Sequence, residues 1–355
     1  MKFEGDDVHF VTALHEAPRE LPGPAFKPTA SGVERFEDES DLHGQGSVLP
    51  SRISGALGNV RFLFTIGSGV STVSHVTIHP TAVVSPLAQL AADVKIGPYA
   101  VIEDGVSIGA GCEIAAHAVI KRFTTLGQRN RVFEHATLGG EPQEVKFRGE
   151  ASRLIVGDDN LIRENVTIHR ATGEGEATRI GSRNYLMIGV HIAHNCVLED
   201  DCIFANGTAL AGHISVEDHV FLSNEVGVHQ FVRLGRYAMV GAKAKIVQDV
   251  LPFLISDGNP CRVRGLNSVG LRRAGFSSEA RLNLKRACHL LMRSMLPLET
   301  ALEGMERLKD ENVRHLVRFV RGSRRGFTRE PRIRVAETAE TNGANGVAAL
   351  DDFLD

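Results

Sequence analysis

The sequence predicts a mainly β protein, a parallel β-helix of hexapeptide repeats followed by a small α-helical domain. Three observations support this fold class. Aliphatic residues recur every six positions between Val76 and Ile246, a compact residue stands two positions before most of them, and the spacing becomes helical after Ser277. A period of six fits neither an amphipathic helix nor an alternating strand, and it is typical of a hexapeptide β-helix.

The repeats form two long runs, over residues 75–139 and 180–246. We expect each large aliphatic residue to point inward and to stack on its equivalent in the next coil, about 4.8 Å away. Glycine often follows the aliphatic residue, as at Gly97, Gly109 and Gly127, and we expect it there because a tight corner requires a positive φ. Three hexapeptides per coil predict about nine coils and a prism about 40 Å long. The alternative, a β-sandwich with accidental periodicity, does not explain so many repeats.

The division into domains follows this rhythm. The predicted domains are a poorly ordered N-terminal extension (1–74), the β-helix (75–262), a helical domain (263–329) and a loose tail (330–355). Within the extension, a short element is expected near Arg61 to Ile66. The β-helix is interrupted by two insertions, at 140–150 and 171–177, and such insertions at solenoid corners often carry function.

The helical domain is predicted from caps and breakers. Ser277 is a candidate N-cap, and Pro297 ends the helix that begins there. Residues 298–308 and 312–319 are expected to form two more helices. A helical domain after an open solenoid covers the edge strands of the last coil.

Composition limits the function classes. The net charge of −3 gives no signal for nucleic acid or for an acidic membrane surface. Three of the five cysteines, Cys112, Cys196 and Cys202, occupy the compact position of the repeat, which predicts reduced core residues and not a disulfide framework. The N-terminus lacks a signal-peptide pattern and no apolar stretch is long enough to span a bilayer, so a cytoplasmic location is expected.

Five histidines suggest where chemistry occurs. Because one coil takes about eighteen residues, His194 and His213 should lie on successive coils, with His229 on the coil above. His191 and His169 lie on earlier coils of the same region. A column of histidines on an otherwise apolar prism is a candidate for general base catalysis. The alternatives are solvated corner histidines without a role, and a Zn²⁺ site, which a His-x-x-His pair on an extended chain fits poorly.

Three further segments offer ligand-binding groups. The loop from Gln143 to Lys146 carries polar groups and one cation, and the segment from Asn267 to Arg273 joins an asparagine to paired arginines, which suit phosphate recognition. The helical domain is locally basic, which suggests an acidic partner, although a plain charged helix surface is the alternative. Its basic residues are Arg272, Arg273, Arg281, Lys285, Arg286, Arg293, Arg318, Arg321, Arg324 and Arg325.

At these residues the sequence resembles a known family, the acyl-[acyl-carrier-protein]–UDP-N-acetylglucosamine O-acyltransferases of lipid A biosynthesis. The resemblance runs from His75 to Thr328. The matching strings are Gly139 to Gln143 with Lys146, Arg163 to Arg170, His191 to Cys196, Leu210 to His213, Val228 to Phe231, Gln248 to Val250, Asp257 to Pro260 and Gly270 to Ser277.

The resemblance implies a left-handed coil, a homotrimer and active sites between neighbouring subunits. It implies that His194 is the general base, which takes the proton from the glucosamine 3-hydroxyl, and that the Gly212 N–H stabilises the oxyanion. The basic helical face would receive the acyl carrier protein, and no metal or cofactor is expected. The implied substrate-binding residues are His191, His213, His229 and Gln230 along the groove, His169 beside them, Gln143, Glu144 and Lys146 in the loop, and Asn267 and Arg273 at the uridine diphosphate.

Some positions depart from the family pattern. Val269 and Ala274 stand where a glutamate and a second arginine are common, and Glu144 replaces a more usual aspartate. Ala242 lies near the groove end that limits acyl length, and alanine in place of glycine predicts a medium-length 3-hydroxyacyl chain.

Three rival functions remain open on sequence grounds alone. One is a related hexapeptide acyltransferase that uses a CoA thioester or another amino-sugar nucleotide. The second is a metal-dependent carbonic anhydrase-like trimer, and the third is a binding solenoid without catalysis.

Overall fold

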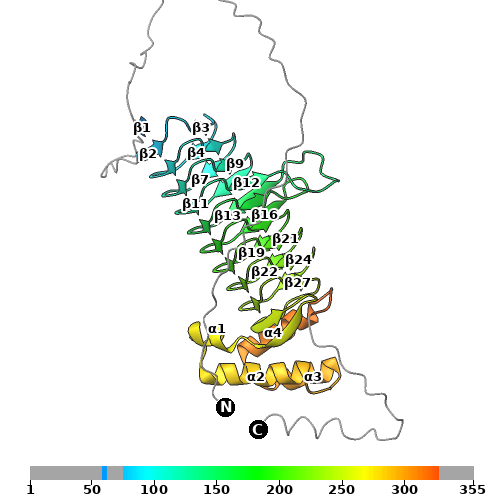
Figure 1. Cartoon of the computed structure of the whole chain (residues 1–355). Coiled ribbons are helices and arrows are strands. Elements are labelled where there is room, and N and C mark those ends of the chain that lie inside the picture. Colours follow the sequence, from blue (N-terminus) through cyan, green and yellow to red (C-terminus); the bar gives the residue numbers. More distant parts are fainter. Residues whose placement is uncertain (1–57, 62–74, 328–355) are drawn as a thin grey trace, which may run out of the picture. The chain divides into compact units, whose positions relative to one another are not determined.

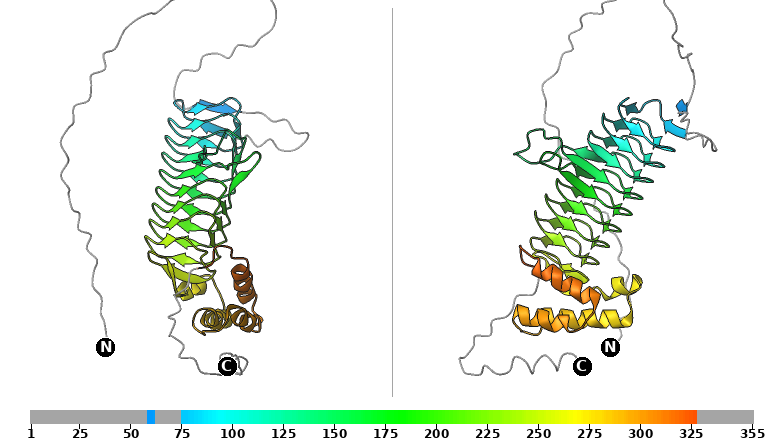
Figure 2. Two further views of the ribbon diagram at one scale, coloured as in Figure 1. Left: turned by 90° about the vertical axis from the view of Figure 1, so that its right-hand side faces the viewer. Right: turned by 180° about the vertical axis from the view of Figure 1, so that it is seen from behind.

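The fold class is confirmed. The computed structural model describes residues 58–61 and 75–327, and these form a left-handed parallel β-helix followed by four helices (Figure 1). The strands make three sheets, the sides of a prism, in which neighbouring strands belong to successive coils (Figure 2). Most pairs are offset by eighteen residues, as where Ile96 pairs with Ile78 on one side and with Ile114 on the other.

The first side is a twelve-stranded sheet that begins and ends with antiparallel pairs, β1 with β2 and β28 with β29. Its strands are β1 (Gly58–Arg61), β2 (His75–Ile78), β5 (Lys95–Ile96), β8 (Glu113–Ile114), β11 (Arg131–Val132), β14 (Leu161–Ile162), β17 (Tyr185–Leu186), β20 (Ile203–Phe204), β23 (Phe221–Leu222), β26 (Met239–Val240), β28 (Leu254–Asp257) and β29 (Arg262–Leu266).

The second and third sides are parallel throughout. The nine-stranded sheet contains β3 (Val83–Val84), β6 (Val101–Ile102), β9 (Val119–Ile120), β12 (Thr137–Gly140), β15 (Thr167–His169), β18 (His191–Ile192), β21 (Ala209–Leu210), β24 (Gly227–Val228) and β27 (Lys245–Ile246). The eight-stranded sheet contains β4 (Gln89–Leu90), β7 (Ser107–Ile108), β10 (Thr124–Leu126), β13 (Arg153–Val156), β16 (Ala177–Ile180), β19 (Val197–Leu198), β22 (Ser215–Val216) and β25 (Arg233–Leu234).

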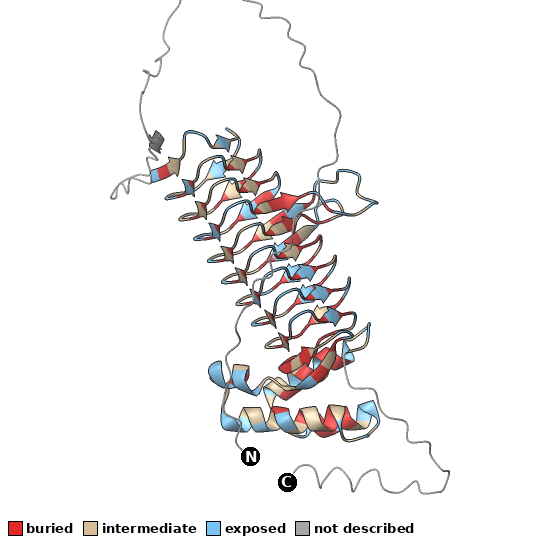
Figure 3. Ribbon diagram, in the orientation of Figure 1, coloured by how far each residue is buried: buried red, intermediate tan, exposed pale blue. Residues whose placement is uncertain are grey.

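The core follows the predicted register. The aliphatic residue of each hexapeptide points inward and is fully buried through most of the prism, as at Ile102, Ile120 and Leu138, so that buried and exposed positions alternate along each coil (Figure 3). The three cysteines of the compact position are buried and unpaired, as expected. Burial raises the pKa of the Cys196 thiol to about 12, so it behaves as an inert core group.

The compact position also takes asparagine, and the hydrogen bonds that these asparagines make between coils were not predicted from the sequence. Asn130, Asn160 and Asn184 are buried on consecutive coils. The Asn160 side chain donates to Oδ1 of Asn130 at 2.9 Å, and Asn160 Oδ1 accepts the backbone N–H of Asn184 at 2.9 Å. The neighbouring coils satisfy the side-chain amides of Asn130 and Asn160, whereas Nδ2 of Asn184 has no partner among the described groups.

The corner glycines correct one expectation. Gly97, Gly109 and Gly127 do not have positive φ; a Cβ on Gly109 would lie 2.4 Å from the Gly127 carbonyl oxygen, so close coil stacking requires glycine there. Positive φ instead recurs three positions before most of the aliphatic residues, usually at residues other than glycine. Tyr99 and His117 are examples at +57° and +60°, and their rings stack at 5.1 Å.

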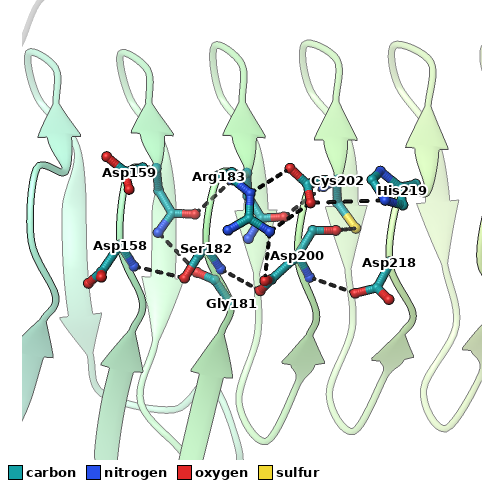
Figure 4. Close-up of polar contacts among 12 residues, drawn as sticks. Asp158, Asp159, Gly181, Ser182, Arg183, Asp200, Cys202, Asp218 and His219 are labelled. Atoms are coloured by element: carbon teal, nitrogen blue, oxygen red, sulfur yellow. Dashed lines mark hydrogen bonds and ion pairs between the residues drawn. The ribbon is translucent and has the colours of Figure 1, made fainter. Parts of the chain in front are cut away.

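One corner carries a ladder of polar side chains, each of which accepts a backbone N–H of the preceding coil (Figure 4). Asp200 Oδ1 accepts the Ser182 N–H at 2.8 Å, and Asp218 Oδ1 accepts the Asp200 N–H at 3.2 Å. Beside it, Arg183 binds Asp201 through two hydrogen bonds of 2.8 Å. The ladder occupies the fourth position before each aliphatic residue, where the coil leaves the N–H without a backbone acceptor.

Four helices follow the last coil: α1 (Ser268–Arg273), α2 (Ser278–Met292), α3 (Leu298–Glu306) and α4 (Glu311–Arg321). Ser277 caps α2, as predicted, and accepts the Ala280 N–H at 3.1 Å, whereas α1 was not predicted. The Arg233 guanidinium joins prism and helices, because it binds Asp249 and lies 4.0 Å over the Phe319 ring. These helices share a core with Leu251 and other residues of the last coil.

Some expectations fall wholly or partly outside the described residues. These are the loose tail and the extension before residue 75, of which only β1 is described. The short element expected from Arg61 to Ile66 shares only Arg61 with β1. Strand β29 crosses the expected boundary at residue 262, so the division into domains remains a prediction. None of the described helices is long and apolar enough to cross a bilayer.

Candidate active site

A pocket of about 470 Å³ opens on the outer face of the nine-stranded sheet, where strands β18, β21, β24 and β27 end. Six of the predicted site residues line it together, although they are up to 87 positions apart in the sequence. They are Gln143, His191, His194, Gly212, His229 and Gln230. The rest of the wall is largely aliphatic, which suits a ligand with an apolar part.

His194 has the most constrained side chain in the pocket. It follows β18 at a corner and is only 4% exposed. Its Nδ1 lies 2.9 Å from Oδ1 of Asn195. Because Asn195 Oδ1 also accepts the backbone N–H and the hydroxyl of Thr172, it acts as an acceptor toward the ring. Nδ1 therefore carries the proton, and Nε2 is the nitrogen with a free lone pair.

Asn195 and Thr172 hold the His194 ring in place, and the sequence reasoning singled out neither of them. Thr172 belongs to the second insertion and lies twenty-three positions before Asn195. The Asn195 N–H donates to Thr178 Oγ1 at 2.8 Å, and its side-chain amide donates to the Thr172 carbonyl at 3.1 Å. The only signal in the sequence was the position of Asn195 directly after His194.

Gly212 lies against the His194 ring. A Cβ on Gly212 would lie 2.6 Å from Cε1 and 2.7 Å from Nε2 of His194, so the ring requires glycine at this position. In the described part of the chain no acceptor pairs with the Gly212 N–H, in contrast to the N–H of Ser182 at the equivalent corner position. The pocket thus contains an open donor beside the candidate base, the arrangement of an oxyanion site.

The neighbouring histidines form two edge-to-face pairs. His194 and His213 have ring centroids 5.2 Å apart, as predicted for successive coils, and His169 and His191 are also 5.2 Å apart. Burial, with the nearby His169, lowers the pKa of His191, whose Nδ1 lies 2.8 Å from Thr167 Oγ1. Burial and His194 lower the pKa of His213, and the Glu144 carboxylate opposes that shift.

Several predicted site residues do not line the pocket of a single chain. His169, His213, Glu144 and Lys146 are not among its lining residues, and Lys146 is exposed. Ala242 is exposed at the corner after β26.

Two of the predicted residues belong to α1. Asn267 caps this helix by accepting the Gly270 N–H at 3.1 Å, and its amide donates to the Tyr237 carbonyl at 3.0 Å. Arg273 is exposed in the last turn. Their expected ligand roles remain predictions.

The described residues contain no group of three or more His, Cys, Asp or Glu side chains placed to hold a metal ion. The pocket residues can instead transfer a proton at His194 Nε2 and bind an anionic oxygen at the Gly212 N–H.

Two family models match the sequence. Residues 249–328 match the model described as UDP N-acetylglucosamine O-acyltransferase, domain 2, and residues 88–122 and 177–212 match the bacterial transferase hexapeptide model.

Curated relatives carry the name acyl-[acyl-carrier-protein]–UDP-N-acetylglucosamine O-acyltransferase. The protein of Herminiimonas arsenicoxydans is 46% identical over 261 residues, which are 71% of this chain and 99% of the relative. That of Gloeothece citriformis is 51% identical over 195 residues, 55% of this chain and 71% of the relative.

Solved structures agree with these relatives. LpxA of Acinetobacter baumannii matches with a TM-score of 0.69 and 38% identity over 71% of this chain and 99% of that one. The UDP-N-acetylglucosamine acyltransferase of Francisella novicida matches with a TM-score of 0.70 and 34% identity over 74% of this chain and 100% of that one.

Proposed function

The chain belongs to the family of acyl-[acyl-carrier-protein]–UDP-N-acetylglucosamine O-acyltransferases, and from this premise we propose how its pocket works. The chain is an acyltransferase that uses an acyl carrier protein as donor and UDP-N-acetylglucosamine as acceptor. We propose that the acyl group is a 3-hydroxyacyl chain, that the acceptor atom is the 3-hydroxyl, and that the reaction is the first step of lipid A biosynthesis in the cytoplasm.

In the proposed mechanism His194 is the general base. Its Nε2 takes the proton of the sugar 3-hydroxyl, and the oxygen attacks the thioester carbonyl. The Gly212 N–H binds the oxyanion of the tetrahedral intermediate. The C–S bond then breaks, and the protonated His194 returns its proton to the leaving thiolate. The observation that carries this proposal is the buried His194 ring, held at Nδ1 by Asn195 and packed against Gly212.

The remaining pocket residues are proposed to bind the substrates. Gln143, His191, His229 and Gln230 offer hydrogen-bonding groups at the edge of an apolar wall, which suits a sugar bound beside an acyl chain. The His169 ring contacts that of His191, the His213 ring contacts that of His194, and Glu144 and Lys146 extend the polar edge.

We propose a homotrimer in which a neighbouring subunit completes each site. Support comes from the outward positions of the twelve-stranded sheet, which are apolar on six consecutive coils and incompletely buried in the single chain. A polar face is the rule for a solvated sheet, and an apolar stripe of this kind is typical of an interface. These positions are Leu161, Tyr185, Ile203, Phe221, Met239 and Ile255. Asn267, Arg273 and Ala242 would contribute to a site from across this interface.

The acyl carrier protein is proposed to dock on one of the two basic clusters of the helical domain. Within the described ranges, the cations of α4 are paired with glutamates, as Arg314 is with Glu311 at 2.7 Å and Arg321 with Glu306 at 2.6 Å. The cluster that we call the α1–α2 basic face has no ion pair to a described carboxylate, so its charge remains available to an acidic partner. It consists of Arg264, Arg272, Arg273, Lys285 and Arg293, of which Arg264, Lys285 and Arg293 line one cavity of about 260 Å³.

The first test is acyl transfer from 3-hydroxyacyl carrier proteins of several lengths to UDP-N-acetylglucosamine, followed by mass spectrometry. His194→Ala should lower transfer by about 10²–10⁴-fold, because a general base contributes that much. The exposed corner histidine His117, which stacks on Tyr99 and His135, gives a matched control, His117→Ala.

Each outcome of this experiment has a distinct meaning. Equal transfer by His194→Ala and wild type would rule out His194 as the base. No transfer by folded wild type would reject the substrate pair, and a 3-amino sugar nucleotide and acetyl-CoA would then be tested. A preference for the longest donors would reject the medium-length chain predicted from Ala242.

A further inference from the structure

Arg170 is an almost fully buried arginine whose contacts are concentrated on the inserted loop before β13. Only 3% of it is exposed. Its Nη1 donates to the Glu150 carbonyl at 3.0 Å, and its Nη2 lies 3.4 Å from a Glu141 carboxylate oxygen. Its guanidinium lies over two aromatic rings, 5.3 Å from the centroid of Phe123 and 5.1 Å from that of Phe147.

These contacts join both ends of the loop to the prism. Glu141 begins the loop after β12, Phe147 lies in its middle, and Glu150 precedes the return to β13. Phe123 belongs to a corner of the prism, and the same guanidinium lies over its ring. The backbone N–H of Arg170 also binds the Gly140 carbonyl at 2.9 Å. The loop lies outside the hexapeptide ladder, so it needs such contacts to hold one position.

Burying the charged Arg170 side chain costs desolvation free energy. A guanidinium loses hydration when it is buried, and only close pairing offsets that loss. Here Nε has no partner among the described groups, and the Glu141 side chain is 73% exposed, so solvent screens that ion pair. The backbone carbonyl and the two aromatic faces remain as the principal contacts, and a planar guanidinium matches both. An apolar side chain would fill the space at lower cost but could not bind the loop backbone.

The loop places Gln143 in the wall of the candidate active site, between the anchored positions 141 and 147. From this geometry we propose that Arg170 is a positioning residue: it holds loop 141–150 over the pocket so that Gln143 reaches the nucleotide sugar. This inference rests on the proposed function for its substrate, but the anchoring of the loop does not.

The test compares Arg170→Met and Arg170→Lys with wild type by hydrogen exchange and by steady-state kinetics. Both variants should increase amide exchange in residues 141–150 and leave the coils of residues 180–246 unchanged. The KM for UDP-N-acetylglucosamine should rise about 10-fold with kcat within about 3-fold, because binding and not the base is affected. Lysine retains the charge but not the planar guanidinium, so Arg170→Lys should show smaller increases in loop exchange and in KM than Arg170→Met.

Arg131→Met is the matched control, because Arg131 also lies over an aromatic ring, 5.1 Å from the centroid of Phe133, but on an exposed surface of the prism. It should change neither loop exchange nor KM. If Arg170 acts through Gln143, the single variant Gln143→Ala should already raise the KM. The double variant with Arg170→Met should then raise the KM little further.

Unchanged exchange in residues 141–150 would overturn the anchoring role, whatever the substrate proves to be. An exchange increase together with unchanged KM, or with a KM effect fully additive to that of Gln143→Ala, would overturn the link to Gln143. Absence of transfer in wild type would instead reject the proposed substrates while the exchange result stands. If Arg170→Met does not fold, Arg170→Lys carries the same comparison.

Discussion

Nδ1 of His194 lies 2.9 Å from Oδ1 of Asn195, and this contact determines which nitrogen of the ring is free to act. The amide oxygen is fixed in turn by the backbone N–H and the hydroxyl of Thr172, both at 2.9 Å. An asparagine orients the ring and its tautomer but adds no negative charge to stabilise the imidazolium that forms during transfer. In this site orientation, not charge, is the contribution of the second residue.

Asn195→Ala should therefore lower kcat by about 10–100-fold, less than removal of the base itself, because His194 remains but its tautomer and orientation are no longer fixed. Asn195→Asp should retain or exceed wild-type activity, since it keeps the acceptor and adds charge. The control is Asn165→Ala, because Asn165 is an exposed asparagine with nearly the same φ, +58° against +57°, at another corner. Equal losses in Asn195→Ala and Asn165→Ala would show that backbone strain, not orientation of the ring, is responsible.

Gly212→Ala should lower kcat by about 10²–10³-fold, the effect of disturbing an oxyanion donor. Its Cβ would lie 2.6 Å from His194 Cε1, so the ring must move from the open N–H. Gly212 does not have a left-handed φ, so alanine brings no backbone strain, and the thermal midpoint should change little. A variant that unfolds at a much lower temperature and loses activity in proportion would contradict the catalytic explanation.

The buried asparagine ladder gives a prediction for stability alone. Asn160→Ala should lower the free energy of unfolding by about 1–3 kcal/mol, because the N–H of Asn184 and the carbonyl of Gly181 lose their partners inside the core. Cys202→Ala, at the same position two coils further along, removes only a weak thiol donor and should cost about 1 kcal/mol or less. Urea unfolding of both variants measures the difference, and equal costs would show that the amide contacts contribute nothing.

The period of the sequence predicted the parallel coil, the inward aliphatic residues and the proximity of His194 to His213 on successive coils, because all three depend only on repeat length. The ladder of Asn130, Asn160 and Asn184 escaped prediction because its hydrogen bonds join neighbouring coils, and a single hexapeptide gives no sign of that. The positive φ of the corner was predicted at the wrong residue. The composition of a hexapeptide does not distinguish a glycine required by close coil stacking from one required by a positive φ.

The fine structure of the site depended on the insertions, where no repeat constrains the chain. Thr172, from one insertion, fixes Asn195, and Arg170 anchors the other insertion so that Gln143 enters the pocket. The sequence places these residues near the relevant motifs but does not show which backbone groups their side chains reach. The helix that holds Asn267 and Arg273 was also missed, because its six residues lack an apolar period.

The lowered pKa values of His191 and His213 predict a pH dependence of stability. In the folded chain the pKa of each histidine lies below the ordinary value of about 6.5. As pH falls below that value, the unfolded chain binds protons first, so the free energy of unfolding decreases until pH passes below the folded pKa values; above about pH 7 there is no contribution. Wild type should therefore lose more stability between pH 7.5 and 5.5 than His191→Gln or His213→Asn, as measured by urea unfolding. A steeper loss in either variant would contradict the sign of the shifts.

The two basic clusters of the helical domain should respond differently to charge reversal. Lys285→Glu with Arg293→Glu removes cations from the α1–α2 basic face, which has no described carboxylate partner, and should raise the KM for the acyl carrier protein about 10-fold at low salt. The KM for UDP-N-acetylglucosamine should not change. Arg314→Glu with Arg318→Glu alters the net charge equally, but these cations already bind Glu311 at 2.7 and 3.1 Å, so the KM for the carrier protein should change far less.

Salt separates this docking effect from a fold defect. Attraction between exposed charges is screened over about 8 Å at physiological ionic strength, so the difference between wild type and the Lys285/Arg293 variant should shrink as salt increases. A general loss of structure would persist at high salt and would also lower kcat with the nucleotide sugar at saturation. Equal effects of the two double variants would mean that net charge, and not the unpaired face, attracts the carrier protein, because the variants change the net charge equally but differ in the position and the pairing of the cations.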